Sequence, residues 1–343
     1  MDKDIVLSVR NLNVKFSLRG KVLHAIRDVS LDLYRGETLA IVGESGSGKS
    51  VLTKTFMGLL DANGWVDSGS ILYEGNDLAQ YKTEKEWLTI RGREIAMVLQ
   101  DPMTSLNPLK TVGAQIEEAL LLHRQLTPAQ AHQRMIEIMT DVGISDPERR
   151  SRQYPHEFSG GMRQRVVIAI AVACKPQILI CDEPTTALDV TIQAQILQLI
   201  RDLVHKYHLT TVYITHDLGV VANVADRVAV MYAGDIVEVG TSREVFYDAR
   251  HPYTWALLSS LPQLGVRGEK LFSIRGTPPN LYLPIKGDAF APRNPYALKI
   301  DFEERPPFFE ISPTHKARTW LLHPDAPAVE PPAVLKRLKQ EEY

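Results

Sequence analysis

Cysteine is nearly absent from this sequence: there are two among 343 residues, Cys174 and Cys181, both inside apolar runs. Two such residues cannot build the disulfide framework of a secreted scaffold or a cysteine-rich metal cluster. Long apolar runs are missing too, because the longest is Val166–Cys174, whereas a membrane-spanning helix needs about 20 residues. The start, "MDKDIVLSVR", is acidic where a secretion signal requires a basic flank, so we expect a soluble, intracellular chain.

An excess of charge of one sign is also missing. The 39 lysines and arginines nearly balance the 41 acidic residues, for a net charge of −2. The composition therefore does not predict a nucleic-acid partner, although a local basic patch remains compatible with it. The hydrophobic fraction of 44% and the charged fraction of 23% are typical of a globular protein, and the length allows one large domain or two of ordinary size.

Proline is scarce in the first 250 residues and abundant afterwards: 14 of the 21 prolines lie at or beyond residue 250. Before that point, apolar strands alternate with amphipathic helices, which is typical of an α/β fold. After it, segments such as "GTPPNLYLP" and "ERPPF" indicate loops and extended chain. We predict an α/β domain over residues 1–260 and a small, irregular, loop-rich C-terminal domain over residues 261–343.

A glycine-rich stretch, "LAIVGESGSGKS", matches the phosphate-loop pattern G-x-x-x-x-G-K-[ST]. It follows a short apolar strand, Leu39–Val42, and precedes an amphipathic helix, a context that argues against a chance match. Small residues allow backbone N–H groups to surround phosphates, while the lysine reaches the β- and γ-phosphates and the serine ligates Mg²⁺. The predicted loop consists of Gly43, Glu44, Ser45, Gly46, Ser47, Gly48, Lys49 and Ser50.

Two acidic residues, Asp182 and Glu183, follow the wholly apolar strand Ile178–Cys181. Such a strand is typical of the middle of a parallel sheet, and the carboxyl ends of these strands are where such sheets bind ligands. We predict that Asp182 holds Mg²⁺, usually through water, and that Glu183 polarises the water that attacks the γ-phosphate. The alternative is a polar strand end entering a turn, but the phosphate loop upstream favours the catalytic interpretation.

Two more polar residues follow predicted strands: "TVYIT" ends at His216, and "EIAMVLQ" ends at Gln100. If these strands end at the same sheet edge, His216 can reach the γ-phosphate, and Gln100 can contact Mg²⁺ or the attacking water. A single histidine after a strand is more often structural, so these assignments depend on their shared placement. Gln100 also precedes the loop "DPMTSLNPLK", which we expect to be mobile.

A second glycine-rich helix start, "FSGGMRQR", raises the question of why one chain needs two phosphate sites. Ser159 can cap the helix, and Gly160 and Gly161 permit close approach of a phosphate. Because the first loop already binds the phosphates of its own nucleotide, the second would be redundant within one subunit. We predict that it closes on a nucleotide held by another subunit, so that two head-to-tail chains enclose two nucleotides.

These motifs, in this order, resemble the ATP-binding subunits of ABC transporters, and the resemblance covers roughly residues 5 to 260. It implies a P-loop ATPase head with a mixed sheet and a helical subdomain over about residues 101–175, using ATP and Mg²⁺. It also implies a nucleotide-sandwich dimer that ATP closes and hydrolysis reopens. The stretch "ALD", Ala187–Asp189, adds Asp189 to the nucleotide interface. Met162 departs from the glutamine of many members, and we interpret it as a subfamily variant.

The adenine ring should stack on an aromatic residue near the first strands. Phe16, in "LNVKF", is the candidate, and the alternative is that this ring is a core aromatic.

A narrower resemblance concerns "HPYTWALLSSLP", "IRGTPPNL" and "GESGSGKS…VLQDPMTSLNP". These stretches are similar to the ATP-binding subunits of oligopeptide and dipeptide importers. The resemblance implies a subunit bound peripherally at the cytoplasmic face of the membrane, where its ATPase activity drives peptide import. It also implies a second ATPase subunit, expected to be a paralogue, two transmembrane permeases and an extracytoplasmic peptide-binding protein.

The C-terminal segment departs from that group in one respect. Many members carry iron–sulfur cysteines in a pattern like G-C-x-F-x-x-R-C, but here "GDAFAPRN" has Asp288 and Asn294 at those positions, and Thr319 occupies another. No cysteine follows Cys181, so we expect no iron–sulfur cluster. We expect aromatic side chains to supply the core of this segment instead, namely Phe290, Phe302, Phe308 and Trp320.

Other proteins share this catalytic head. Chromosome-maintenance and repair ATPases interrupt it with a long coiled coil, whereas about 110 residues without sustained heptads separate the phosphate loop from Ser159. Translation factors of this type need a second head, and the chain has one phosphate loop. A non-enzymatic binding module would lack Lys49 or Glu183. A subunit for another solute, such as nickel, or for an exporter remains the alternative.

Overall fold

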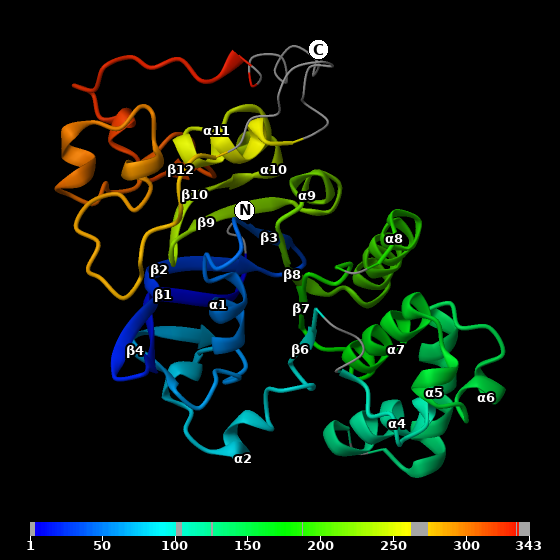
Figure 1. The fold of residues 1–343 in the computed structure, drawn as a ribbon. Helices are drawn as coiled ribbons and strands as arrows, with labels where there is room; N and C mark the ends of the chain where they lie inside the picture. Colours follow the sequence, from blue (N-terminus) through cyan, green and yellow to red (C-terminus); the bar gives the residue numbers. More distant parts are fainter. Residues whose placement is uncertain are drawn as a thin grey trace.

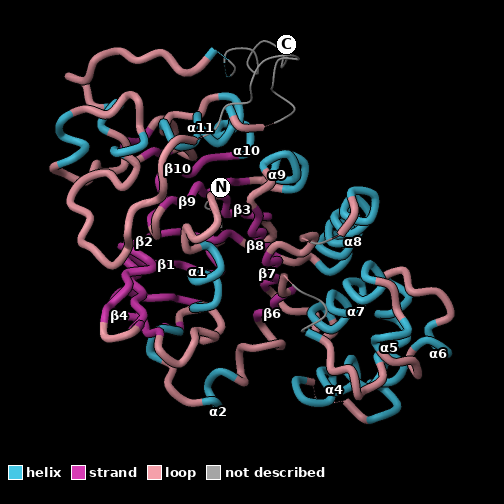
Figure 2. Tube along the Cα trace, in the orientation of Figure 1, coloured by secondary structure: helices cyan, strands magenta, loops and turns pink. Residues whose placement is uncertain are grey.

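The computed structural model describes residues 4–100, 105–124, 126–186, 188–261, 274–333 and 335. Two sheets lie against each other, with helices covering the outer face of the larger sheet and a further group of helices beyond one of its edges (Figure 1). Figure 2 shows that strands concentrate in the middle of the molecule and that loops dominate the C-terminal part. The α/β class and the mixed sheet predicted from the sequence are confirmed.

The smaller sheet is antiparallel, with the strand order β2-β1-β4-β5. Its strands are β1 (Ile5–Leu18), β2 (Lys21–Tyr34), β4 (Gly64–Tyr73) and β5 (Asn76–Asp77). A two-residue turn, Arg19–Gly20, joins β1 to β2, and both residues have positive φ (50° and 76°), the conformation that matches the twist of a tight hairpin.

The larger sheet has the order β11-β12-β10-β9-β3-β8-β7-β6. Its strands are β3 (Thr38–Val42), β6 (Ile95–Val98), β7 (Ile178–Asp182), β8 (Thr210–Thr215), β9 (Arg227–Tyr232), β10 (Asp235–Thr241), β11 (Phe309–Glu310) and β12 (Lys316–Ala317). The run from β9 to β6 is parallel, and β10, β12 and β11 continue it antiparallel. All five residues of β7 are buried, as predicted for a central strand.

Helices connect and cover these strands. They are α1 (Lys49–Thr55), α2 (Glu84–Trp87), α4 (Val112–His123), α5 (Pro128–Asp141), α6 (Pro147–Arg150), α7 (Gly160–Val172), α8 (Val190–Tyr207), α9 (Leu218–Val224), α10 (Ser242–Tyr247) and α11 (Pro252–Ser259). Short 3-10 turns are η1 (Leu78–Gln80), η2 (Pro155–Glu157), η4 (Ala291–Arg293), η5 (Lys299–Phe302) and η6 (Trp320–Leu322). None of the described helices has the length and apolar character needed to cross a bilayer.

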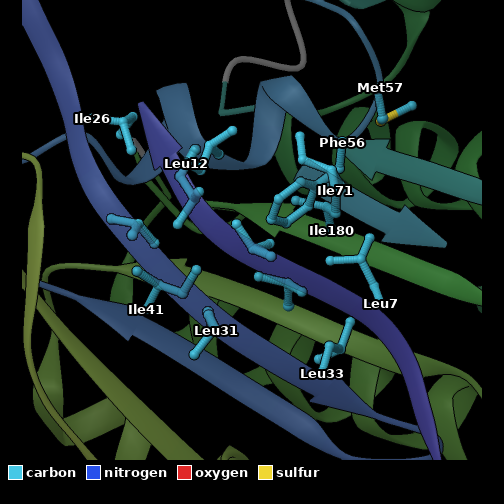
Figure 3. Close-up of a cluster of buried hydrophobic side chains, with 14 of the residues drawn as sticks. Leu7, Leu12, Ile26, Leu31, Leu33, Ile41, Phe56, Met57, Ile71 and Ile180 are labelled. Atoms are coloured by element: carbon cyan, nitrogen blue, oxygen red, sulfur yellow. The ribbon is translucent and has the colours of Figure 1, made fainter. Parts of the chain in front are cut away.

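The two faces of the parallel strands pack against different partners. Ile178 and Ile180 of β7 join a cluster with the antiparallel sheet and α1, and Figure 3 shows Ile41 and Ile180 beside the side chains of that sheet. Leu179 and Cys181, which alternate with them, join a second cluster with α4, α5, α7 and α8. The helices α1 and α7 therefore lie on opposite faces of the sheet.

The C-terminal segment adds to the sheet of the head, because β12 pairs with β10 and β11 pairs with β12. Phe290 is 1% exposed and packs against Tyr232 and Tyr253, as expected for a core aromatic. Phe302 is 56% exposed, so its predicted place in the core is wrong; it lies at the end of the one-turn helix η5, which has little face to bury.

The positions compared with iron–sulfur cysteines, Asp288, Asn294 and Thr319, are all buried. The C-terminal segment therefore encloses polar side chains where the related pattern has thiols. The division near residue 260 and the helical subdomain over about residues 101–175 remain proposals, and residues 101–104 lie outside the described residues.

Candidate active site

Four neighbouring parallel strands end at one edge of the large sheet. The register places their last residues side by side: Val42 with Thr215, Ile214 with Asp182, and Cys181 with Val98. The phosphate loop, His216 and Glu183 follow directly after three of these strands, and Gln100 lies two residues beyond the end of β6. The sequence order and the parallel arrangement together bring the predicted residues to one edge.

The phosphate loop runs from Gly43, directly after β3, to Ser50 in the first turn of α1. A Cβ atom on Gly43 would lie 2.1 Å from the carbonyl oxygen of Met231, so only glycine fits the close approach to β9. Lys49 Nζ donates to the carbonyl oxygens of Gly43 at 2.8 Å and Glu44 at 2.9 Å. Burial lowers the pKa of Lys49, against the opposing charges of Glu183, Asp182 and Glu44. The amine is thus held inside the loop, where phosphate oxygens would lie.

Ser50 and Asp182 meet across the sheet edge, with the Ser50 hydroxyl donating to Asp182 Oδ1 at 2.9 Å. Burial raises the pKa of Asp182, the Ser50 hydrogen bond opposes this, and the charge of Glu183 adds to it. A buried carboxylate and a hydroxyl are the hard oxygen donors that Mg²⁺ prefers. Among the described residues no group of three or more His, Cys, Asp or Glu could hold a metal by itself. This donor pair fits a Mg²⁺ ion whose remaining ligands are phosphates and water.

Glu183 lies at the centre of the site. Its Oε1 is 3.1 Å from His216 Nδ1, and its Oε2 accepts from Gln100 Nε2 at 3.1 Å and from Thr186 Oγ1 at 3.0 Å. Burial acts to raise its pKa, but the hydrogen bonds from His216 and Thr186 and the charge of Lys49 bring the net pKa below the ordinary value. Glu183 is therefore ionised at neutral pH, the state that a base requires.

The Ser-Gly-Gly stretch begins α7, as predicted. The Ser159 hydroxyl accepts from the backbone N–H of Met162 at 3.4 Å, so the serine caps the helix. Asp189 caps α8 in the same way, accepting from Ile192 N–H at 3.0 Å. Its neighbour Ala187, from the "ALD" stretch, lies outside the described residues.

Because α7 and α1 belong to clusters on opposite faces of the sheet, the two helices of one chain do not lie side by side (Figure 1). The contacts of Ser159, Gly160, Gly161 and Asp189 with a nucleotide remain predictions.

Phe16 is 9% exposed and belongs to the cluster between the two sheets. Its ring covers Gly64 of β4, where a Cβ atom would lie 2.5 Å from the ring. The surroundings of Phe16 are those of a core aromatic, the alternative interpretation above, and its stacking on adenine stays a prediction.

Three residues near the site were not predicted from the sequence. Thr186 holds Glu183, Tyr253 Oη accepts from the backbone N–H of Glu44 at 2.8 Å, and Arg293 pairs with the Glu44 carboxylate. Thr186 lies in "DEPTTALD", where its distance of three residues from the base was an available signal. Tyr253 and Arg293 lie more than 200 residues after Glu44, so no local pattern indicates them.

Two segments of the chain match known families. Residues 26–186 match the family described as ABC transporter, and residues 237–300 match the one described as oligopeptide/dipeptide transporter, C-terminal region.

Curated relatives match nearly the whole chain. The oligopeptide transport ATP-binding protein AmiE of Streptococcus pneumoniae serotype 4 is 60% identical over 337 residues, covering 98% of this chain and 95% of the relative. The oligopeptide transport ATP-binding protein OppD of Bacillus subtilis is 58% identical over 333 residues, covering 96% and 93%. The dipeptide transport ATP-binding protein DppD of Lactococcus lactis is 57% identical over 332 residues, covering 96% and 95%.

Solved structures agree with the architecture. A dimeric post-hydrolysis state of the ATP-binding cassette MJ0796, bound to ADP and Pi, superposes with a TM-score of 0.62 at 26% identity, covering 69% of this chain and 99% of the other. The cbiO1 protein of Clostridium perfringens, part of the ABC transporter complex cbiONQ, gives a TM-score of 0.61 at 28% identity, covering 71% and 91%. The chain belongs to the ABC transporter ATP-binding family of ATPases, in the group that carries the oligopeptide/dipeptide transporter C-terminal region.

Proposed function

We propose that this protein hydrolyses ATP to power the import of oligopeptides or dipeptides through an ABC permease in the cytoplasmic membrane. The support for the cargo is the set of relatives at 57–60% identity, whose names specify oligopeptide or dipeptide transport. The C-terminal match to the oligopeptide/dipeptide transporter region supports the same cargo. The chain then binds peripherally at the cytoplasmic face of the membrane.

The chemistry rests on the phosphate loop and on Glu183. Lys49 and the loop N–H groups bind the β- and γ-phosphates, and the buried amine offsets the charge that develops during transfer. Glu183 orients and polarises the attacking water, while His216 and Gln100 hold its two carboxylate oxygens. Ser50 and Asp182, with Gln100 nearby, would hold Mg²⁺, which when bound neutralises phosphate charge. The observation that carries this assignment is the convergence of Gln100, Thr186 and His216 on one ionised glutamate.

The second glycine-rich helix start acts on a nucleotide held by a partner ATPase subunit, which we expect to be a paralogue. Ser159, Gly160 and Gly161 lie at the first turn of α7, on the opposite face of the sheet from α1. A head-to-tail pair would bring this turn, together with Asp189, onto the partner's phosphate loop. The dimeric state of the MJ0796 cassettes supports such pairing.

The remaining partners are two transmembrane permeases and an extracytoplasmic peptide-binding protein. The test is co-purification of this chain from gently solubilised native membranes, with partners identified by mass spectrometry. We expect two polytopic proteins, a second ATPase and a peptide-binding companion. Recovery with ribosomes or DNA from the soluble fraction would contradict the transport assignment, and a companion that binds nickel or another solute would contradict the peptide cargo.

A further inference from the structure

The C-terminal segment contacts the phosphate loop directly through one side chain. Arg293, at the end of η4, donates from Nη1 to Glu44 Oε2 at 2.6 Å and from Nη2 to Oε1 at 3.0 Å. Glu44 is the second residue of the phosphate loop. The Arg293 side chain is 5% exposed and that of Glu44 is 27% exposed, so this two-point contact is largely shielded from solvent.

Arg293 is fixed on its other sides as well. Its Nε donates to the carbonyl oxygen of Arg275 at 2.9 Å, and its Nη1 donates to Tyr232 Oη at 3.1 Å. Its guanidinium also lies against the rings of Tyr232 and Phe290. The position of the guanidinium is therefore fixed by several contacts besides the one with Glu44.

The backbone of Glu44 is held by the same region. Its N–H donates to the hydroxyl of Tyr253, a fully buried residue of α11 whose ring packs against Tyr232 and Phe290. The carbonyl oxygen of Glu44 accepts from Lys49 Nζ at 2.9 Å. Glu44 thus contacts both Tyr253, which packs in an aromatic cluster with Tyr232 and Phe290, and Lys49, which would bind the γ-phosphate.

Two physical consequences follow for a bound polyphosphate. A phosphate loop binds phosphates through backbone N–H groups that must point at the ligand. Because the contacts with Arg293 and Tyr253 fix Glu44, the loop loses less conformational entropy when it binds. An unpaired carboxylate in the loop would repel the phosphates, and the Arg293 guanidinium neutralises it.

We propose that Arg293 is a positioning residue of the nucleotide site, through which the C-terminal segment sets the affinity of the phosphate loop for ATP. Tyr253 acts with it by holding the backbone of Glu44. The proposal rests on the phosphate-binding role proposed above for residues 43–50. It gives the C-terminal segment a function in nucleotide binding that is separate from contact with any partner.

The test compares ATP binding by the full-length chain, measured by calorimetry with Mg²⁺, for Arg293→Met and Arg305→Met. Arg305 is the matched control, because it also joins the C-terminal segment to the head, but through Asp28 and Asp235 at 2.8 Å each. We expect Arg293→Met to raise the Kd for ATP roughly tenfold, as loss of a charge-assisted contact predicts. Arg305→Met should leave the Kd unchanged. Equal weakening in both variants would indicate general destabilisation and overturn the proposal.

Three further variants keep the test decisive. Tyr253→Phe should also raise the Kd, severalfold, even if Arg293→Met fails to fold. Glu44→Gln combined with Arg293→Met should bind ATP no more weakly than Arg293→Met alone, whereas independent, multiplying losses would contradict the pairing. Lys49→Ala should abolish binding. Unchanged binding in Lys49→Ala would refute the phosphate-loop assignment itself, while wild-type binding in Arg293→Met and Tyr253→Phe alone would refute only the positioning role.

Discussion

Glu183 has a left-handed backbone conformation, with φ of 46°, which is uncommon for a non-glycine residue. Its N–H nevertheless donates to the carbonyl oxygen of Ile214 in β8 at 2.9 Å, so the sheet holds the residue in this conformation. The turn places the carboxylate beside Gln100 and His216. Backbone strain of this kind is often found where a side chain must point into a reaction site.

A second acid, Asp288, differs from Glu183 in the sign of its pKa shift. Burial raises the pKa of Asp288 to about 7; the charges of Asp301 and Asp235 add to this, while the Phe290 N–H and the Arg27 charge oppose it. The folded protein therefore keeps a proton that the unfolded chain releases above about pH 4. The free energy of unfolding should fall, on the order of a few kcal/mol, as pH rises from about 4 to 7, and the loss persists above that range.

Asp288→Asn removes this titration and should flatten the same pH interval. Urea unfolding of both proteins at about pH 5 and pH 8 measures the difference. Identical pH dependence in the two proteins would contradict the assignment of a raised pKa to Asp288.

At the residue scale, the sequence predicted where the candidate residues lie wherever chain order alone determines position. Gln100, Glu183 and His216 each follow a strand, and parallel strands end at one edge. The roles of Arg293 and Tyr253 were not predicted, because their contacts with Glu44 join distant parts of the chain. Such contacts depend on tertiary packing, and the spacing of residues in a local sequence motif does not indicate them.

Among the elements, α7 is the one to which the proposed function assigns a role on a second subunit. Ser159 caps its N-terminus, as the sequence predicted, and its buried side chains belong to the cluster on the face of the sheet opposite α1. Local capping chemistry was sufficient to predict where this helix begins. The two-residue strands β11 and β12 were not predicted, because so short a segment carries no periodicity and their pairing depends on β10.

Ser159→Arg is expected to leave ATP binding by this chain intact. It should strongly reduce hydrolysis by the assembled complex, because a bulky cation would occupy the helix start that we propose to face the partner's nucleotide. Thr127→Arg is the matched control: Thr127 caps α5 in the same group of helices, so both variants remove a cap worth about 1 kcal/mol. The ATPase rate of the complex reports the difference. Full activity with Ser159→Arg, or equal losses in both variants, would contradict action in trans.

On the scale of the whole molecule, the proposed function requires one chain to supply two incomplete halves of different sites. The phosphate loop and Glu183 lie at the edge where the parallel strands end. The helix α7 lies on the face of the sheet opposite α1. The C-terminal segment extends the head's sheet through β12 and contacts the phosphate loop through Arg293. The C-terminal segment and the phosphate loop are therefore in direct contact within one fold.

The measurement that tests this account most directly is ATP turnover by the assembled complex carrying Glu183→Gln. It is combined with ATP binding by the variant chain and light scattering of that chain mixed with its partner ATPase. The amide nearly preserves the shape of the carboxylate but cannot act as a base, so turnover should fall at least about 100-fold. ATP binding should persist and the closed dimer should accumulate, because hydrolysis no longer reopens it. Hydrolysis near the wild-type rate would contradict the assignment of Glu183 and the mechanism that depends on it.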